Sequence, residues 1–366
     1  PETQVVSGTP ITIDVTGEEH FATLYEIQES PHEPGVIWAG ANDGPIHLTR
    51  DGGATWTEVT PAELGPHGRV QTIEVSPHDP AAAYAAVLRY QLGDFSPHVY
   101  ATRDYGATWS RLTTGDNGIP KDVPVRVVRE DPVRPGLLYA GTEFGMYVSF
   151  NAGAQWQDLQ LNLPVTPVTD LKLVKNDLVL STMGRSFWIL YDRSPLFVAS
   201  AELAVEPATL YAVQDAVRLY TGGRWRRPSD DAARPQYPSV GANINYYIAE
   251  EATDEMRVEI FDDNGTLVRE IVPETPKPEQ DSEDPDDTME SPEAPPGKPT
   301  PDALRTTAGM HRVVWDLRDP GLYIVALAQD ADVFSPLDDV PAQRPERLVS
   351  DEQDGGVLVL DVVAQV

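Results

Sequence analysis

A short turn motif occurs three times in the first half of this chain. Its copies are Thr49–Trp56, Thr102–Trp109 and Ser149–Trp156. Each begins with a hydroxyl residue, continues with Asp or Asn and then Gly, and ends in Trp, and successive copies are about 50 residues apart. A period of this length is typical of a four-stranded β-propeller blade and not of a helical repeat. We call these three segments the repeat turns.

The similarity between the copies extends upstream of each repeat turn. Each is preceded by a Pro-containing turn and a short apolar strand, in Ser30–Gly40, Ser76–Ala85 and Asp131–Gly141. A fourth unit, Asp177–Tyr191, has two apolar strands but lacks the repeat turn. The sequence therefore predicts about four blades.

The residue types of the repeat turns indicate a structural role. An Asp or Asn side chain can accept hydrogen bonds from backbone N–H groups ahead of it, and Gly adopts the positive φ of a tight turn. The Trp is predicted to be buried between neighbouring blades, with its indole N–H bonded to a backbone oxygen. The structural residues are Asp51, Gly53, Trp56, Asp104, Gly106, Trp109, Asn151, Gly153 and Trp156.

At these residues the chain resembles the Asp-box family, also called bacterial neuraminidase repeats, with the pattern Ser/Thr-x-Asp-x-Gly-x-Thr-Trp. The third copy departs from it at Asn151 and Gln155. Three further segments resemble large bacterial proteins related to the sortilin N-terminal propeller: Gly141–Ser149, Leu159–Leu171 and Gly184–Leu190. Those proteins are often labelled glycosyl hydrolases, by analogy with sialidases and xyloglucanases. The resemblance implies a peptide or polysaccharide ligand.

The pattern changes after Pro195, so we expect an all-β chain with two parts. Residues 1–197 are predicted to be a partial β-propeller, and residues 198–366 a crossing segment followed by further strands. Strands are predicted at Ala242–Ile248, Met256–Phe261, Thr266–Ile271 and Gly309–Leu317, with Asn264-Gly265 as a hairpin turn. The resemblance implies an immunoglobulin-like β-sandwich here. Residues 272–305, rich in Pro, Glu and Asp, are expected to be a disordered insertion.

A propeller usually closes with four to eight blades, and the Asp-box relatives use more than four. The roughly four blades predicted for this chain are therefore fewer than its relatives have. The first residue is Pro1 rather than Met. We therefore expect residues 1–197 to be the C-terminal part of a larger propeller. Either an upstream propeller segment of the same parent protein or a neighbouring chain completes the ring. An extracellular or periplasmic parent is expected, its signal peptide lying outside this chain.

Composition excludes several classes of function. The net charge of −31 is opposite to that of a nucleic-acid binder, because a phosphate backbone would be repelled. With no cysteine, the chain has no disulfide, thiolate metal site or cysteine nucleophile. No apolar run approaches the roughly 20 residues of a membrane span. The seven histidines lack ligand spacing and no cofactor motif is present, so neither metal nor cofactor is expected.

Two functions remain open, and no residue can be assigned a catalytic role. The first is a binding scaffold that uses the loops Tyr90–Pro97 and Glu143–Met146. Its candidate binding residues are Tyr90, Glu143, Tyr147, Arg185 and Trp188. The second is part of a glycoside hydrolase whose cleft needs the upstream propeller. Two carboxylates facing each other across a cleft lined by aromatic residues would favour it.

A sialidase-like site would need several Arg residues that converge on a substrate carboxylate, together with a Tyr nucleophile. Arg126, Arg129, Arg185 and Tyr147 are available for those roles. Arg126 and Arg129 are more simply explained as residues that flank a strand, so we do not expect this site.

Overall fold

The computed structural model describes residues 23–198, 207–216, 241–252, 256–262, 265–273 and 303–317, and the backbone of residues 361–365. The chain divides into two compact units, Pro1–Arg193 and Ser194–Val366. Within the described ranges, all six sheets are antiparallel, and the one α-helix, α1, is the short segment Ser194–Val198. The predicted all-β class is confirmed.

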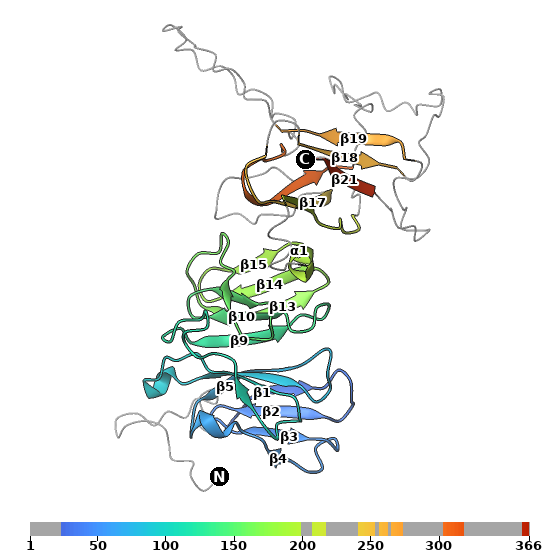
Figure 1. Ribbon diagram of the computed structural model, residues 1–366. Coiled ribbons are helices and arrows are strands. Elements are labelled where there is room, and N and C mark those ends of the chain that lie inside the picture. Colours follow the sequence, from blue (N-terminus) through green and yellow to red (C-terminus); the bar gives the residue numbers. More distant parts are fainter. Residues whose placement is uncertain are drawn as a thin grey trace, which may run out of the picture. The chain divides into compact units, whose positions relative to one another are not determined.

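The first unit consists of four sheets, each a meander of consecutive strands (Figure 1). Sheet 1 contains β1 (Leu24–Glu29), β2 (Ile37–Ala41), β3 (Ile46–Thr49) and β4 (Thr57–Glu58). Sheet 2 contains β5 (Arg69–Val75), β6 (Ala83–Leu88), β7 (Val99–Thr102) and β8 (Ser110–Arg111). Sheet 3 contains β9 (Val125–Glu130), β10 (Leu138–Thr142), β11 (Met146–Ser149) and β12 (Gln157–Asp158). Sheet 4 has only three strands, β13 (Val168–Val174), β14 (Asp177–Thr182) and β15 (Phe187–Leu190).

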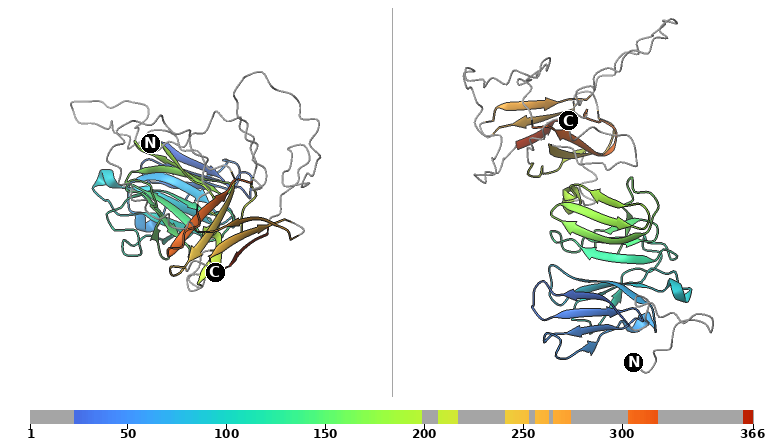
Figure 2. Two further views of the ribbon diagram at one scale, coloured as in Figure 1. Left: turned by 90° about the horizontal axis from the view of Figure 1, so that it is seen from above. Right: turned by 180° about the vertical axis from the view of Figure 1, so that it is seen from behind.

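The four sheets lie side by side in chain order, as the view from behind also shows (Figure 2). This is the arrangement of successive blades in a partial β-propeller. It agrees with the blade count predicted from the repeats. The missing fourth strand of sheet 4 accompanies the missing repeat turn of the fourth unit.

The cores of the first unit lie between neighbouring sheets. Trp38 and Ile46 of sheet 1, for example, pack in one buried cluster with Ile73 and Tyr100 of sheet 2. A small residue on the second strand lets the next sheet approach. A Cβ added at Gly40 would lie 2.4 Å from a Val70 methyl group, so a larger residue there would push sheets 1 and 2 apart.

The repeat turns connect the third and fourth strands of sheets 1 to 3. In the first, Asp51 accepts hydrogen bonds from the Thr55 backbone N–H (2.8 Å) and hydroxyl (2.6 Å). The second turn has the same two bonds between Asp104 and Thr108, and in the third Asn151 Oδ1 accepts from the Gln155 N–H. Each turn also donates a backbone N–H to the Pro-containing turn of its own sheet. The side chain thus supplies the acceptors that the tight turn lacks.

The repeat turn should be sensitive to acid. Hydrogen bonds from Thr55, and a further one from Thr49, hold the pKa of Asp51 at about 2, below its ordinary value of 3.8. Because the folded pKa is depressed, these bonds stabilise the turn above about pH 4, and the contribution disappears as the pH falls toward 2. Thr55→Val is expected to raise the pKa of Asp51 toward 3.8 in an NMR titration of the carboxyl carbon. Thr108→Val, in the second turn, should leave it unchanged.

The three repeat tryptophans are not equally buried, and the prediction is wrong for Trp56. Trp156 is 3% exposed and donates its indole N–H to the Leu112 carbonyl at 3.1 Å. Trp109 is half-buried and donates to the Val59 carbonyl at 2.7 Å. Trp56 is 45% exposed. Trp109 and Trp156 each pack on the sheet that precedes their own, whereas no described sheet precedes sheet 1.

A second set of contacts ties consecutive sheets together at the turns that follow their first strands. His32 Nε2 donates to the Ser76 carbonyl (3.0 Å), and His78 Nε2 donates to the Asp131 carbonyl (2.6 Å). After sheet 4, Arg193 forms an ion pair with the Asp131 carboxylate, and both side chains are fully buried. The two histidines therefore have the turn role that their equivalent places in the repeat indicate.

In its described residues, the second unit contains two three-stranded sheets around one core. One consists of β16 (Ala208–Leu210), β17 (Ala242–Ile248) and β20 (Gly309–Trp315), the other of β18 (Arg257–Phe261), β19 (Leu267–Ile271) and β21 (Asp361–Gln365). Ile244, Val258 and Trp315 belong to the shared cluster. The four predicted strands are present. Asn264, most of the predicted crossing segment and most of the acidic insertion lie outside the described residues.

Candidate functional site at the loop end of the sheets

The turns of an antiparallel meander alternate between its two ends. The repeat turns lie at one end of sheets 1 to 3. At the other end, which we call the loop end, the turn from second to third strand lies beside the connection that enters the same sheet. Backbone hydrogen bonds join the two at Asn42 N to Thr23 O (2.9 Å) and at Glu143 N to Pro124 O (3.1 Å). Each sheet therefore presents two adjacent segments at its loop end.

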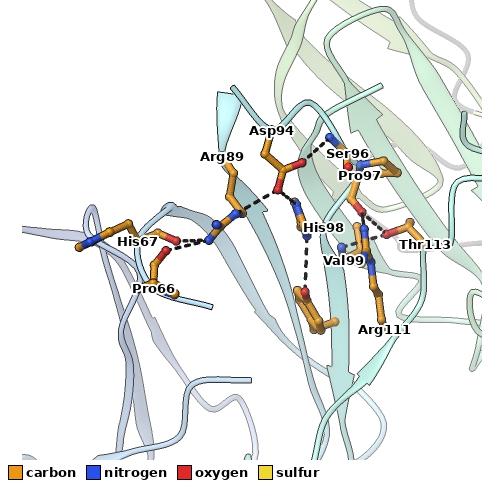
Figure 3. A network of polar contacts seen from close by, with 11 residues as sticks. Pro66, His67, Arg89, Asp94, Ser96, Pro97, His98, Val99, Arg111 and Thr113 are labelled. Atoms are coloured by element: carbon orange, nitrogen blue, oxygen red, sulfur yellow. Dashed lines mark hydrogen bonds and ion pairs between the residues drawn. The ribbon is translucent and has the colours of Figure 1, made fainter. Parts of the chain in front are cut away.

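The longest loop-end turn, residues 89–98, is held by a polar network (Figure 3). Asp94 lies between Arg89 and His98, with one carboxylate oxygen 3.1 Å from Arg89 Nε and 2.8 Å from His98 Nε2. Arg89 also donates to the carbonyls of Pro66 and His67, in the connection from sheet 1 to sheet 2. The turn is thereby bonded to the neighbouring connection.

The protonation states of this network suit a structural role. Burial lowers the pKa of His98 despite the nearby Asp94 carboxylate, so the imidazole is neutral at neutral pH. Partial burial of Asp94 opposes ionisation, but hydrogen bonds from Ser96 and His98 outweigh it and hold the carboxyl pKa well below its usual range. With Nε2–H donating to Asp94, Nδ1 is the acceptor that faces the Tyr100 hydroxyl at 3.4 Å. Tyr100 is buried, so the chain of contacts ends in the core.

Apolar side chains project into solvent from the loop-end segments. Each is more than half exposed, and they are Leu92, Phe95, Phe144, Leu161, Val165 and Met183. We call them the loop-end apolar residues. Loops held by partly buried polar bonds while they expose large apolar side chains are typical of binding surfaces.

A charged cluster lies on the innermost strands. Arg129 of β9 donates to Glu74 of β5 (2.8 Å) and to Asp170 of β13 (3.0 Å), so one guanidinium joins three sheets. Glu74 and Arg129 line a hollow of about 180 Å³, together with Pro77, Glu130, Pro132, Lys172 and Leu173. The hollow has no aromatic lining.

Burial raises the pKa of Glu74 even though Arg129 favours its ionised form. Burial likewise raises the pKa of Glu26, which lies on β1, the first strand of sheet 1. A raised carboxyl pKa is a property of general acids. However, Glu74 and Asp170 share one guanidinium and do not face each other across an aromatic-lined cleft, so the geometry favours an ion-pair network over an acid–base pair.

Three of the predicted binding residues lie in loop-end turns. Tyr90 begins the short 3₁₀ turn Tyr90–Leu92 and is half-buried. Glu143 forms an ion pair with Arg126 at 2.6 Å. Arg185 is exposed in the turn between β14 and β15, and its carbonyl accepts the indole N–H of Trp188 (2.8 Å).

Tyr147 lies on β11 and packs against the core between sheets 2 and 3. Burial raises the pKa of its hydroxyl, which is the opposite of what a tyrosine nucleophile requires. Arg126 and Arg129 are each paired with carboxylates of this chain. The structure therefore does not assemble the sialidase-like set.

Sequence reasoning missed the loop-end apolar residues and the Arg89–Asp94–His98 network. Their position in the sequence was the signal that could have revealed the apolar residues. Leu92, Phe95 and Phe144 lie in the turns that follow the second strand of a repeat, where polar residues are usual. Among the described side chains, no group of three or more His, Asp or Glu residues is arranged to hold a metal ion. No helix in the described ranges is long and apolar enough to cross a membrane.

No protein-family model and no curated protein matches the chain. Solved structures of β-propeller proteins are similar in fold. They include YCF48 from Cyanidioschyzon merolae, with 20% identity and a TM-score of 0.34 over 47% of this chain and 54% of that one. YCF48 bound to D1 peptide has 14% identity and a TM-score of 0.36 over 69% of this chain and 70% of that one. The GH74 xyloglucanase from Xanthomonas campestris has 15% identity and a TM-score of 0.37 over 71% of this chain and 39% of the enzyme. This chain thus spans about half of the first protein and less than half of the xyloglucanase.

Proposed function

We propose that this chain is part of a large bacterial or archaeal Asp-box β-propeller protein and serves as a scaffold that binds a peptide or a glycan. The observation that carries the proposal is the set of loop-end apolar residues on loops held by partly buried polar bonds. Burying a Leu or Phe side chain contributes about 1.5 to 3 kcal/mol, so several of these residues together supply a favourable term that offsets part of the cost of association. A loop that is already ordered loses little entropy on binding.

The proposal has several further parts. The second unit is an immunoglobulin-like sandwich that follows the propeller, as in the sortilin-related proteins that the sequence resembles. The parent protein is extracellular or periplasmic, where polysaccharides and peptides are available as ligands. Sheets of an upstream propeller segment or of another chain complete the ring.

Removing the apolar side chains of the longest loop should weaken ligand binding. Leu92→Ser combined with Phe95→Ser is expected to reduce affinity at least about tenfold for a ligand found on a peptide or glycan array, because 1.4 kcal/mol corresponds to tenfold. Both side chains are already exposed in the free protein, so its stability should change little. Binding would be measured by isothermal titration calorimetry.

Val133→Ser provides the matched control. Val133 is as exposed as the loop residues, but it lies in the turn between β9 and β10, at the opposite end of sheet 3. Its replacement should leave affinity unchanged. Equal losses in both variants, or full affinity in the double variant, would rule out the loop end as the binding surface.

A second candidate function is a glycoside hydrolase whose cleft is completed by the upstream propeller. The observation that favours it is Glu74, whose pKa is raised in the manner of a general acid, with Asp170 on the other side of Arg129. Polysaccharide hydrolysis by the parent protein that is abolished by Glu74→Gln but retained in Glu143→Gln would support this function. Binding without hydrolysis across a polysaccharide panel would exclude it.

A further inference from the structure

The first strand of every sheet in the first unit contains one residue that has no counterpart on the second strand. The strand registers shift at Tyr25 of β1, Gln71 of β5, Arg126 of β9 and Thr169 of β13. Each is therefore the extra residue of a β-bulge, which interrupts the ladder and redirects a side chain. Bulges are common at sheet edges and next to active sites. We call these four residues the bulge row.

The bulge row lies at the loop end of the sheets. Each member is within the first three residues of its strand, just after the connection that enters the sheet. The first strands of consecutive sheets contact one another directly (Figure 1). Gln71 Nε2 is 3.5 Å from the Tyr25 hydroxyl, and Thr72 Oγ1 donates to the Arg126 carbonyl at 2.7 Å. The row therefore belongs to the same surface as the loop-end apolar residues.

Two neighbouring members of the row have polar atoms without a partner. Gln71 Oε1 and Arg126 Nε are buried atoms of partly exposed side chains, and neither has a hydrogen-bond partner in the described part of the chain. Buried polar atoms are normally paired. The contact between Gln71 and Tyr25 is at the distance limit of a hydrogen bond, so the amide loses little when it turns toward a ligand. Thr169, by contrast, is bonded to Ser181 of its own sheet.

The unpaired atoms require a ligand that carries both a donor and an acceptor. Gln71 Oε1 accepts a hydrogen bond, and the Arg126 Nε–H donates one. A peptide group supplies both partners, an N–H and a C=O, without charge. A free carboxylate is a poorer match, because the Glu143 carboxylate already pairs with Arg126 at 2.6 Å. A ligand hydroxyl would also provide both partners, so the neighbouring side chains must distinguish a peptide from a glycan.

The side chains beside the row are apolar. Phe144 follows Glu143, whose backbone N–H is bonded to the connection that enters sheet 3. Leu92 and Phe95 extend from the corresponding turn of sheet 2. An aliphatic side chain such as Leu92 gains free energy by removing apolar surface from water. Apolar peptide side chains offer much such surface, whereas a sugar ring carries hydroxyl groups around its edge.

We propose that the bulge row binds the main chain of a peptide while the loop-end apolar residues cover its apolar side chains. Gln71 accepts a ligand N–H, and Arg126 donates to a ligand carbonyl. Tyr25 is 44% exposed and stacks under the Arg69 guanidinium at 4.7 Å, so it gives the peptide an aromatic surface at the sheet 1 end of the row. The net charge of −31 disfavours acidic peptides. This inference rests on the proposed binding function and assigns its ligand class and polar contacts.

Selection from a phage-displayed library of random linear peptides should yield ligands that are rich in apolar residues and poor in Asp and Glu. The affinity of a synthetic consensus peptide would be measured by calorimetry. Gln71→Leu is expected to lower that affinity about two- to tenfold, which corresponds to one neutral hydrogen bond. Gln28→Leu is the matched control. Gln28 is also a partly exposed glutamine on a first strand, but it lies toward the other end of β1, so its replacement should leave affinity unchanged.

An N-methyl scan of the same peptide tests the main-chain contact itself. Methylation removes one backbone N–H and keeps the side chains. At one position it is expected to lower affinity for the wild-type protein and for Gln28→Leu by about two- to tenfold. The same methylation should cost nothing further in Gln71→Leu, because both changes remove one and the same hydrogen bond. Losses that are equal in Gln71→Leu and the wild-type protein at every position would contradict the assigned contact.

Three other results would overturn the inference, and they differ in what they leave of the proposed function. Full affinity in Gln71→Leu, with a loss in the Leu92→Ser and Phe95→Ser double variant, would remove the bulge row and retain the scaffold. Binding to a glycan array without any selected peptide would retain the scaffold and replace its ligand class. Binding to neither library would remove the inference and the proposed function together.

Discussion

Replacing Trp156 by alanine is expected to lower the free energy of unfolding of the first unit by about 3 to 5 kcal/mol. The indole is 3% exposed and packs in the core between sheets 2 and 3. Its removal leaves a cavity and takes the indole N–H donor away from the Leu112 carbonyl, which keeps its hydrogen bond from the Asn117 amide. Urea denaturation followed by circular dichroism would measure the loss.

Trp56, in the first repeat turn, is the matched control for Trp156 in the third. It occupies the equivalent position but is 45% exposed, so Trp56→Ala should cost less than about 1 kcal/mol in dilute, low-salt solution. Trp109, half-buried and bonded to Val59, should give an intermediate loss. Equal losses at Trp56 and Trp156 would show that a preceding sheet also covers the first repeat turn in the isolated chain.

Asp131→Ala is the second substitution with a large expected effect, a loss of about 3 to 5 kcal/mol. Asp131 and Arg193 are both fully buried, and their ion pair links the turn between β9 and β10 of sheet 3 to the segment that follows sheet 4. Without the carboxylate, the buried guanidinium loses this ion pair, and the Tyr139 hydroxyl loses the acceptor that Asp131 provides. Chemical denaturation monitored by fluorescence would measure the change.

Two further variants separate the ion pair from general disruption. Removing both charges, with Asp131→Ala and Arg193→Met together, should cost less than the sum of the two single losses, since no unpaired charge stays buried. Arg185→Met removes an exposed arginine and should change stability by no more than about 0.5 kcal/mol. Additive losses in the double variant would contradict a strong coupling between Asp131 and Arg193.

The sequence alone determined the local structure of the first unit. The Asp51 side chain meets its hydrogen-bond partners within four residues, so the repeat turn can be predicted from a short segment. The same holds for the strands that precede it, whose apolar residues recur in each copy. The blade count follows from these repeats because each of the four described sheets of the first unit is a meander of consecutive strands.

Only the tertiary structure decided which equivalent residues are buried and which groups meet. Trp56 and Trp156 have the same local pattern, yet their exposure differs because a neighbouring sheet covers one and not the other. Arg129 meets Glu74 and Asp170 across 55 and 41 residues of sequence, contacts that no spacing rule predicts. The exposure of the loop-end apolar residues is likewise a product of sheet packing. A turn depends on bonds between near neighbours in the chain, whereas burial depends on surfaces that segments far apart in the sequence bring together.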